Sequence, residues 1–357
     1  MPGFGSIPDL ESILGQKQPI RLLTTLLRND TIPHALLFVG SEGVGKKTTA
    51  MAFAMACNCM AYEDRHFAGG KKTQATADRT TVEHITATSC GCCKSCRKIQ
   101  SGNHPDIILV EPSGNIIKIS QIRDLCHILA MKPFEAKLRL AIISDAQAMN
   151  PSASNALLKV LEEPPERTIL ILTTIQTYDL FPTIVSRCQS FRFSPISGKT
   201  LETLLLEKQR ANPEDARIIA AMANGSLSKA LSLINPMIRV NWINRRIWLV
   251  DEVESLASKP VGSLLALAAD LAKKKELLGD SLEVIKSWFR DLVICKYYPE
   301  KIINKDLIDR MRPASRKMTV TSLLEKIDYI RLAQKDIQNN GNLRLTLEVL
   351  ILRLARV

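Results

Sequence analysis

The residues of this chain that are best suited to chemistry begin with a glycine-rich turn. Gly40, Gly43 and Gly45 are followed directly by Lys46, and the apolar run 36–39 precedes them. The small residues after Lys46 favour a helix, so the turn lies between an expected strand and an expected helix. In that setting glycines let backbone N–H groups face a phosphate, the helix N-terminus adds positive potential, and the lysine reaches the β- and γ-oxygens. The pattern predicts a phosphate loop.

Two positions that hold Mg²⁺ in a hydrolytic phosphate-loop enzyme have unsuitable residues here. Lys47 stands where a serine or threonine is needed, and Thr48 comes about 100° further around the helix. The expected strand 138–143 is followed by Ser144 in the metal-holding place, and only Asp145 is acidic. Phosphoryl transfer depends on a cation to neutralise developing charge, so we expect little or no ATP hydrolysis. The alternative is that Ser144 holds the ion through water.

A nucleotide could still bind in this degenerate site. The residues that would contact it are Gly40, Gly43, Gly45, Lys46, Lys47, Thr48 and Asp145.

A second cluster with chemical potential is formed by cysteines. Cys90, Cys93 and Cys96 repeat at a spacing of three, which can bring thiolates together around one tetrahedral ion. A closed structural site needs a fourth ligand, for which Cys59 is the first choice and Cys57 the second. The other candidates for that ligand are His66, His84 and Cys92. Because a polar stretch cannot easily bury so many free thiols, we expect structural Zn²⁺.

Apolar runs that are typical of buried strands alternate with helical patterns in the first half of the chain. The expected strands are 36–39, 107–110, 138–143, 169–172 and 191–193. Apolar residues three or four positions apart predict helices between them. Buried strands that alternate with helices favour a mainly parallel α/β sheet.

No strand is expected after about residue 195, where the pattern becomes helical. We predict three domains. They are an α/β nucleotide-binding domain over 1–195 with a zinc module at about 57–100, a helical lid over 196–240, and an all-α C-terminal domain over 241–357. The polar stretch 63–88 is expected to be an insertion or loop.

The composition narrows the class of protein. A formal net charge of +12 over 357 residues favours polyanionic partners, nucleic acid first. No apolar run reaches the roughly 18 residues that a spanning helix needs, and the N-terminus lacks the pattern of a signal peptide. We therefore expect a cytoplasmic protein without a membrane partner.

Several motifs, in this order, resemble those of bacterial clamp-loader ATPases of the AAA+ class. They are Ile13-Leu14-Gly15-Gln16, Pro33-His34-Ala35, Asn58-Cys59 with the later cysteines, Asn103-His104-Pro105-Asp106, Asn155-Ala156-Leu157-Leu158-Lys159, Leu161-Glu162-Glu163-Pro164-Pro165 and Ser186-Arg187-Cys188. The resemblance is dense over residues 4–235 and thin beyond, where 288–292 and 342–345 look like collar helices.

This resemblance implies an AAA+ domain, a lid and a collar, within a hetero-pentamer that loads the sliding clamp onto primed DNA. The implied partners are gamma/tau and delta subunits, the clamp and the DNA backbone. Lys47 and Ser144 favour the non-motor delta-prime class over the gamma/tau motors, and segment 225–229 lacks the arginine that the family's lid contributes. The chain would then belong to a DNA polymerase holoenzyme without being catalytic alone.

The resemblance also gives Arg187 a role outside its own subunit. It implies that this arginine reaches the nucleotide site of a neighbour, where an arginine supplied in trans can raise the rate about 10³- to 10⁵-fold. Without the family context, a routine surface ion pair is the better interpretation of Arg187.

Two other functions stay open as alternatives. One is an active gamma/tau-type motor. The other is a zinc-containing nucleic-acid-binding scaffold, which the basic stretches 71–72 and 312–317 favour and the lack of interleaved aromatic residues disfavours.

Overall fold

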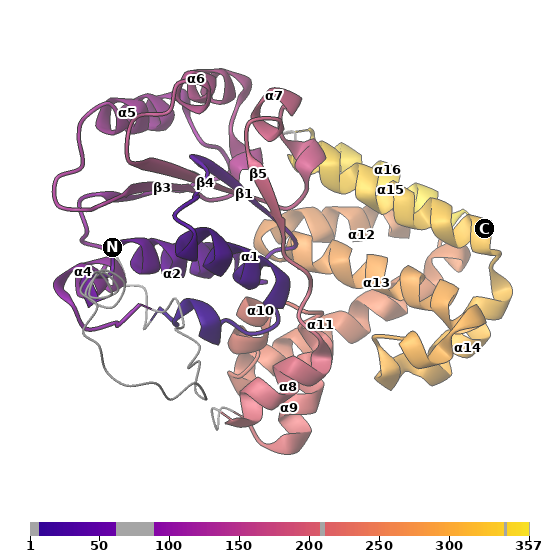
Figure 1. Cartoon of the computed structure of the whole chain (residues 1–357). Helices are drawn as coiled ribbons and strands as arrows, with labels where there is room; N and C mark the ends of the chain where they lie inside the picture. Colours follow the sequence, from indigo (N-terminus) through magenta and orange to yellow (C-terminus); the bar gives the residue numbers. More distant parts are fainter. Residues whose placement is uncertain (1–6, 62–88, 208–210, 339–340, 357) are drawn as a thin grey trace. The chain divides into compact units, whose positions relative to one another are not determined.

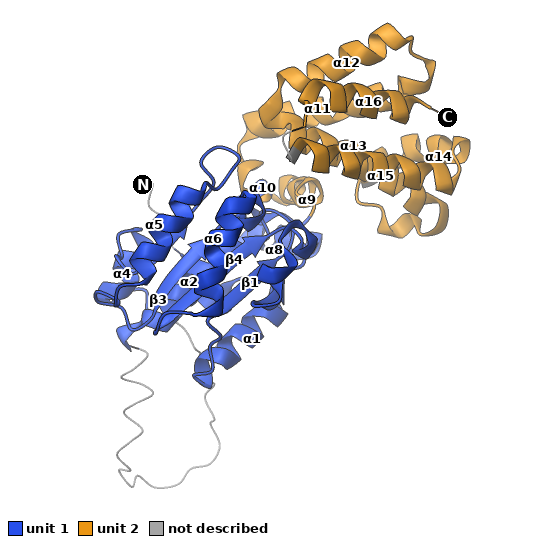
Figure 2. Cartoon of the chain, turned by 90° about the horizontal axis from the view of Figure 1, so that it is seen from above, with its two compact units in different colours: residues 1–209, 225–229 blue, residues 210–224, 230–357 orange. Residues whose placement is uncertain are grey.

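The computed structural model describes residues 7–61, 89–207, 211–338 and 341–356. They fall into two compact units (Figure 2). Unit 1 comprises Met1–Gln209 and Gly225–Lys229, and unit 2 comprises Arg210–Asn224 and Ala230–Val357. Residues 62–88, which include the expected insertion with His66 and His84, lie outside the described part.

Unit 1 is built on a parallel sheet of five strands in the order β2-β3-β4-β1-β5. The strands are β1 (Ala35–Val39), β2 (Ile107–Val110), β3 (Arg139–Ile143), β4 (Thr168–Thr174) and β5 (Gln189–Arg192). Every residue of β3 and β4 is buried, which explains the continuous apolar runs 140–143 and 169–172 within them. Because all strands run in one direction, their carboxyl ends meet at one edge.

Helices cover both faces of this sheet (Figure 1). One face packs against α1 (Lys17–Arg28), α2 (Lys46–Asn58) and α4 (Lys94–Gln100), and the other against α5 (Ile119–Leu129) and α6 (Pro151–Glu162). Leu36 and Phe38 enter the first core, whereas Ala35 and Leu37 enter the second. This alternation is the period of two that a pleated strand imposes. The helices α7 (Pro182–Val185) and α8 (Gly198–Glu207) complete the unit.

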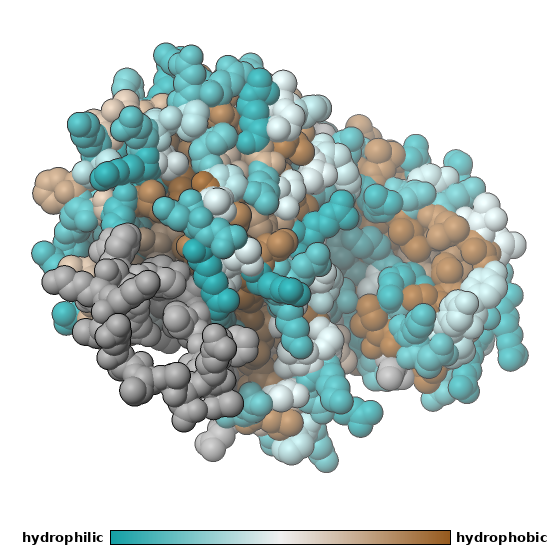
Figure 3. Space-filling model, in the orientation of Figure 1, coloured by the Kyte–Doolittle hydropathy of each residue, from teal (hydrophilic) through white to brown (hydrophobic). Residues whose placement is uncertain are grey.

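The described residues of unit 2 form helices and no strand. These are α9 (Pro213–Met222), the second half of α10 (Leu227–Ser232), α11 (Pro236–Ser255), α12 (Val261–Lys273), α13 (Leu278–Tyr297), α14 (Ile308–Lys317), α15 (Val320–Gln338) and α16 (Leu343–Ala355). Trp288 and Phe289 of α13 are buried at the core of the unit. Figure 3 shows hydrophobic side chains gathered in patches over its helices. None of the helices that the structure describes is long and apolar enough to cross a membrane.

The predicted class, an α/β domain with a parallel sheet followed by helices, is confirmed. Residues of the expected lid are divided between the units, α8 with the first and α9 with the second. The division into three domains stays a prediction.

Candidate functional site

The predicted phosphate loop lies between β1 and α2, at the carboxyl edge of the sheet. Gly43 and Gly45 have φ angles of +73° and +100°, in the left-handed region that favours glycine. A Cβ atom on Gly40 would lie 2.3 Å from the carbonyl oxygen of Phe193, so only glycine allows the chain after β1 to pass this close. Backbone geometry therefore requires the three glycines that the sequence places here.

The side chain of Lys46 folds back onto the phosphate loop. The residue is 7% exposed, and Nζ donates to the carbonyl oxygens of Gly40 at 2.5 Å and Ser41 at 2.8 Å. Burial lowers the pKa of Lys46, while Asp145 and Glu42 act in the opposite direction. A phosphate would have to compete with these loop carbonyls for the ammonium protons.

The residue after it, Lys47, forms an ion pair with Glu111, which follows β2. The distance from Lys47 Nζ to Glu111 Oε1 is 2.5 Å. Thr48 is exposed, and the buried hydroxyl of this turn belongs to Thr49, whose Oγ1 donates to the carbonyl oxygen of Gly45 at 2.8 Å. An ammonium–carboxylate pair thus stands at the position where a hydrolytic enzyme has a metal-binding hydroxyl.

The end of β3 offers one carboxylate. Ser144 is 4% exposed, and its Oγ has no hydrogen-bond partner among the described residues. Asp145 is exposed, has a φ angle of +53°, and its backbone N–H donates to Thr173 Oγ1 at 3.0 Å. The paired acids that would hold Mg²⁺ and polarise water are therefore not present at this strand end, which the structure describes in full.

Segment 225–229 closes against the phosphate loop, although the two are far apart in sequence. The N–H groups of Leu227 and Ser228 donate to the carbonyl oxygen of Gly43 at 2.8 and 3.3 Å. A Cβ atom on Gly43 would lie 2.1 Å from Ser226 Oγ. The sequence predicts no such contact. Lys229 is the segment's single cation.

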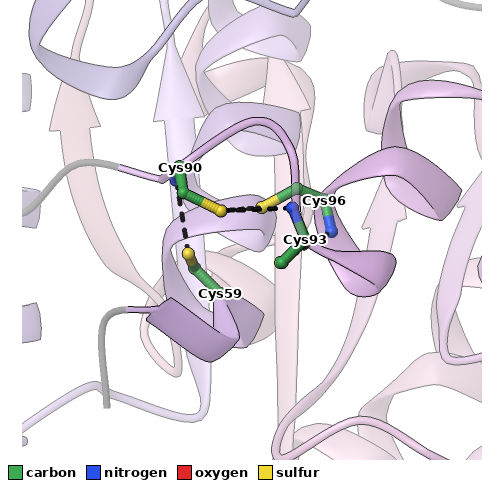
Figure 4. A group of neighbouring side chains, drawn as sticks. All are labelled: Cys59, Cys90, Cys93 and Cys96. Atoms are coloured by element: carbon green, nitrogen blue, oxygen red, sulfur yellow. Dashed lines mark hydrogen bonds between the residues drawn. The ribbon is translucent and has the colours of Figure 1, made fainter. Parts of the chain in front are cut away.

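The predicted metal ligands Cys59, Cys90, Cys93 and Cys96 lie together, and their sulfur atoms are all within 4.8 Å of one another (Figure 4). Cys59 follows the last residue of α2, Cys93 caps α4, and Cys96 lies within α4. Four thiolates bound to Zn²⁺ at about 2.3 Å would lie about 3.8 Å apart, so the cluster fits such an ion after small adjustments.

Backbone N–H groups also point at these sulfurs. Cys90 N–H donates to Cys59 Sγ at 3.3 Å, Cys93 N–H to Cys90 Sγ at 3.3 Å, and Cys96 N–H to Cys93 Sγ at 3.4 Å. Burial would raise the pKa of the Cys90 thiol, but the N–H groups of Cys93 and Cys92 lower it to about 6. Burial raises the pKa of Cys96. Donors aimed at sulfur favour thiolate, the form that binds metal.

The other cysteines that were candidates for the fourth ligand do not join the cluster. Cys57 is buried within α2, where burial raises its pKa, and Cys92 is exposed.

Arg187 lies after α7 and makes an ion pair with Glu162, the last residue of α6. Its Nη2 is 2.8 Å from Glu162 Oε1, and its Nη1 donates to the carbonyl oxygen of Thr183 at 2.9 Å. The Arg187 side chain is 36% exposed.

Known proteins resemble the chain over nearly its whole length. A family model described as "DNA polymerase III, delta subunit" matches residues 15–78 and 70–197, and one described as "DNA polymerase III, delta subunit, C terminal" matches residues 240–356. The delta' subunit of DNA polymerase III from Bacillus subtilis is 30% identical over 343 residues, which cover 95% of this chain and 96% of the relative. This chain belongs to the DNA polymerase III delta-prime subunit family.

More distant relatives are tau and gamma-related subunits of DNA polymerase III. The tau subunit of Bacillus subtilis is 26% identical over 97% of this chain and 61% of its own length, so the chain spans less than two thirds of it. Among solved structures, a gamma-subunit-related protein of Thermotoga maritima superimposes with a TM-score of 0.40 at 16% identity, covering 93% of this chain and 98% of that one. The preference for the delta-prime class over gamma/tau, predicted from Lys47 and Ser144, agrees with the family assignment.

In this delta-prime family member, the motif at 103–106 supplies a buried residue whose role the sequence did not reveal. Asp106 is 0% exposed and accepts backbone N–H bonds from Phe134 at 2.8 Å, Glu135 at 2.8 Å and Ala136 at 2.9 Å. It also pairs with Arg139 at 2.9 Å. Burial would raise the pKa of Asp106, but these donors lower it to about 2. An arginine at the head of the apolar run 139–143 is the sequence signal that could have revealed this buried charge.

Arg139 binds the backbone carbonyl groups at the end of α5 and in the loop that follows it. It donates to the carbonyl oxygens of Ile128, Met131 and Lys132, at 2.5, 2.6 and 2.8 Å. Together the two buried charges fix the loop that joins α5 to β3.

Proposed function

We propose that this chain serves as the delta-prime subunit of a clamp loader, in a hetero-pentamer with gamma/tau and delta subunits. It would help to load the sliding clamp onto primed DNA without hydrolysing ATP itself. The observation that carries the proposal is a phosphate loop whose metal position is taken by the Lys47–Glu111 pair, in a chain related to delta' over 95% of its length. The basic net charge of +12 supports contact with the DNA backbone, which would be sensitive to salt and insensitive to sequence.

Arg187 is proposed to act in trans. Its guanidinium is partly exposed and always charged, and it matches phosphate geometry, so a neighbouring subunit's nucleotide could be reached by it. Exposed apolar side chains of unit 2 support assembly with other subunits. They include Leu324, Leu332, Leu345 and Val349.

The cysteine cluster is proposed to bind one structural Zn²⁺. Its four thiolates come from the end of α2 and from the turn into α4, two segments that residues 60–89 separate in sequence. A closed Cys₄ site leaves no open position for catalysis, so the ion would fix this end of α2 to α4. Reduced cysteines in such a site suit the cytoplasm.

Reconstitution tests this function directly. Clamp loading onto primed DNA by gamma/tau and delta subunits should require this chain, and the chain should elute with them as one complex. ATP turnover by the pure chain in Mg²⁺ should stay at background. Robust hydrolysis by the pure chain would favour the gamma/tau-type alternative, and clamp loading at full rate without the chain would reject the delta-prime role.

A further inference from the structure

Glu162 and Arg187 are brought together from two helices of unit 1 that pack against each other. Glu162 ends α6, and Arg187 follows α7 by two residues. The separation of 2.8 Å between Arg187 Nη2 and Glu162 Oε1 is that of a charge-assisted hydrogen bond. A second contact, from Nη1 to the carbonyl oxygen of Thr183 at 2.9 Å, holds the guanidinium from the helix that precedes it.

These two contacts fix the plane of the guanidinium while leaving part of it exposed. An arginine has five N–H donors, and the contacts to Glu162 and Thr183 use only some of them. The side chains of Arg187 and Glu162 are 36% and 51% exposed, so a neighbouring chain could approach the pair. An arginine in a flexible rotamer would have to be ordered when it meets a phosphate, whereas this one is already ordered.

We propose that Glu162 is a positioning residue for Arg187, which holds the guanidinium ready for the anionic phosphoryl group of the neighbour's nucleotide. This inference rests on the proposed trans role of Arg187. Glu162 itself touches no nucleotide and acts only through the arginine.

Stability is not the role that this pair suits. Ion pairs between exposed side chains contribute little to folding free energy, so a substitution at Glu162 should leave the chain folded. The neighbouring Glu163 provides a matched control, because it is exposed, carries the same charge and already lies outside the helix.

A double-mutant cycle in the assembled complex tests the proposal. Glu162→Ala, Arg187→Ala and the double variant are each combined with gamma/tau and delta subunits, and ATP turnover is measured with clamp and primed DNA. At the site that Arg187 serves, Glu162→Ala should lower kcat about three- to tenfold, which matches the cost of ordering one long side chain, and should leave KM nearly unchanged. The double variant should be no slower than Arg187→Ala alone.

Two further variants sharpen the result. Glu162→Gln keeps an oxygen acceptor and should recover part of the lost rate, whereas Glu163→Ala should behave like the parent. Additive effects in the cycle, or a rate that is unchanged or raised by Glu162→Ala, would overturn the positioning role while leaving the trans role of Arg187 in place. If Arg187→Ala does not slow turnover in a complex that still assembles, the proposed function of Arg187 fails, and the inference fails with it.

Discussion

Single residues decide which chemistry this phosphate loop can perform. Lys47 contributes a positive charge where a hydroxyl oxygen is needed for Mg²⁺, and Glu111 neutralises that charge at 2.5 Å. Ser144 contributes no charge where a carboxylate is needed. The glycines and Lys46 are retained, so the features that contact phosphate are separated here from those that hold the metal.

Restoring the metal ligands should restore the response to Mg²⁺. In the variant Lys47→Thr/Ser144→Asp, a hydroxyl and a carboxylate replace an ammonium and a neutral group, so Mg²⁺ should tighten the binding of a fluorescent ATP analogue. In the parent chain, EDTA should change that affinity little. The further change Lys46→Ala should weaken binding in both backgrounds. Equal Mg²⁺ dependence in the parent and the restored variant would contradict this account of Lys47 and Ser144.

The buried pair of Asp106 and Arg139 should dominate local stability. Asp106→Asn leaves the Arg139 guanidinium buried without a counter-charge, a change that typically costs about 3–5 kcal/mol. Urea unfolding at neutral pH measures this loss. Glu135→Gln, which removes a partly exposed charge that pairs with Lys98 and lies 4.0 Å from His104, should cost far less.

The pH dependence of this contribution has a definite sign. The pKa of Asp106 is about 2 in the folded chain, below its ordinary value of 3.8. The stabilisation is therefore complete above about pH 4 and is lost as the pH falls towards 2. The parent should lose this component of stability in that window, and Asp106→Asn should not. Parallel pH profiles for the two proteins would contradict the assignment.

At the scale of elements, the cysteines connect two helices whose ends are far apart in sequence. Cys59 comes from the end of α2, whereas Cys93 and Cys96 come from the start of α4. Segment 225–229 also joins parts that are far apart in sequence. Two of its N–H groups donate to the carbonyl oxygen of Gly43 and hold the start of α10 against the phosphate loop. Gly225 makes this approach possible, because its φ angle is +83° and a Cβ atom there would lie 2.5 Å from Pro195 Cβ.

Loss of one cysteine ligand should abolish zinc binding at the proposed site. Cys96→Ser removes a buried sulfur from the cluster, so elemental analysis should show well below one zinc per chain, and the melting temperature should fall. Cys92→Ser changes an exposed thiol that lies outside the cluster, so this control variant should retain stoichiometric zinc. A strong chelator should destabilise the parent and the Cys92 variant alike, and should affect Cys96→Ser little.

At the scale of the whole molecule, the chain combines a phosphate loop that lacks the usual metal ligands with an arginine on its surface. Its effect on catalysis should therefore appear only after assembly. In the proposed assembly, the exposed apolar side chains of the helical unit 2 make the contacts with other subunits.

Arg187→Ala tests this separation of roles. ATP hydrolysis at the neighbouring site that Arg187 serves should slow by about 10³-fold or more. Total ATP turnover of the complex should therefore fall by the fraction which that site contributes. Assembly of the complex, which is measured by co-elution of its subunits, should be unchanged. Arg123→Ala, on the exposed side of α5, is the matched control and should leave turnover intact. Loss of assembly in Arg187→Ala alone would assign the arginine to the subunit contact instead.

The sequence by itself determined the features that depend on near neighbours along the chain. The phosphate loop, the unsuitable residues Lys47 and Ser144, and the repeat of Cys90, Cys93 and Cys96 are local patterns, so spacing and residue type were enough to predict them. The strands β1, β3 and β4 were predictable too, because burial on both faces requires continuous apolar runs, whereas β5 is exposed except at Phe191.

Only the tertiary structure decided which distant residues meet. Glu111 pairs with Lys47 across 64 positions, Asp106 accepts a hydrogen bond from Phe134, 28 positions away, and Glu162 at the end of α6 contacts Arg187. None of these contacts has a periodic signal, because each depends on how strands and helices stack around the two cores. The sequence showed that the loop lacks metal ligands. Packing of the helices and strands determined that Glu111 pairs with Lys47 at the metal position and that Glu162 holds Arg187 at the surface.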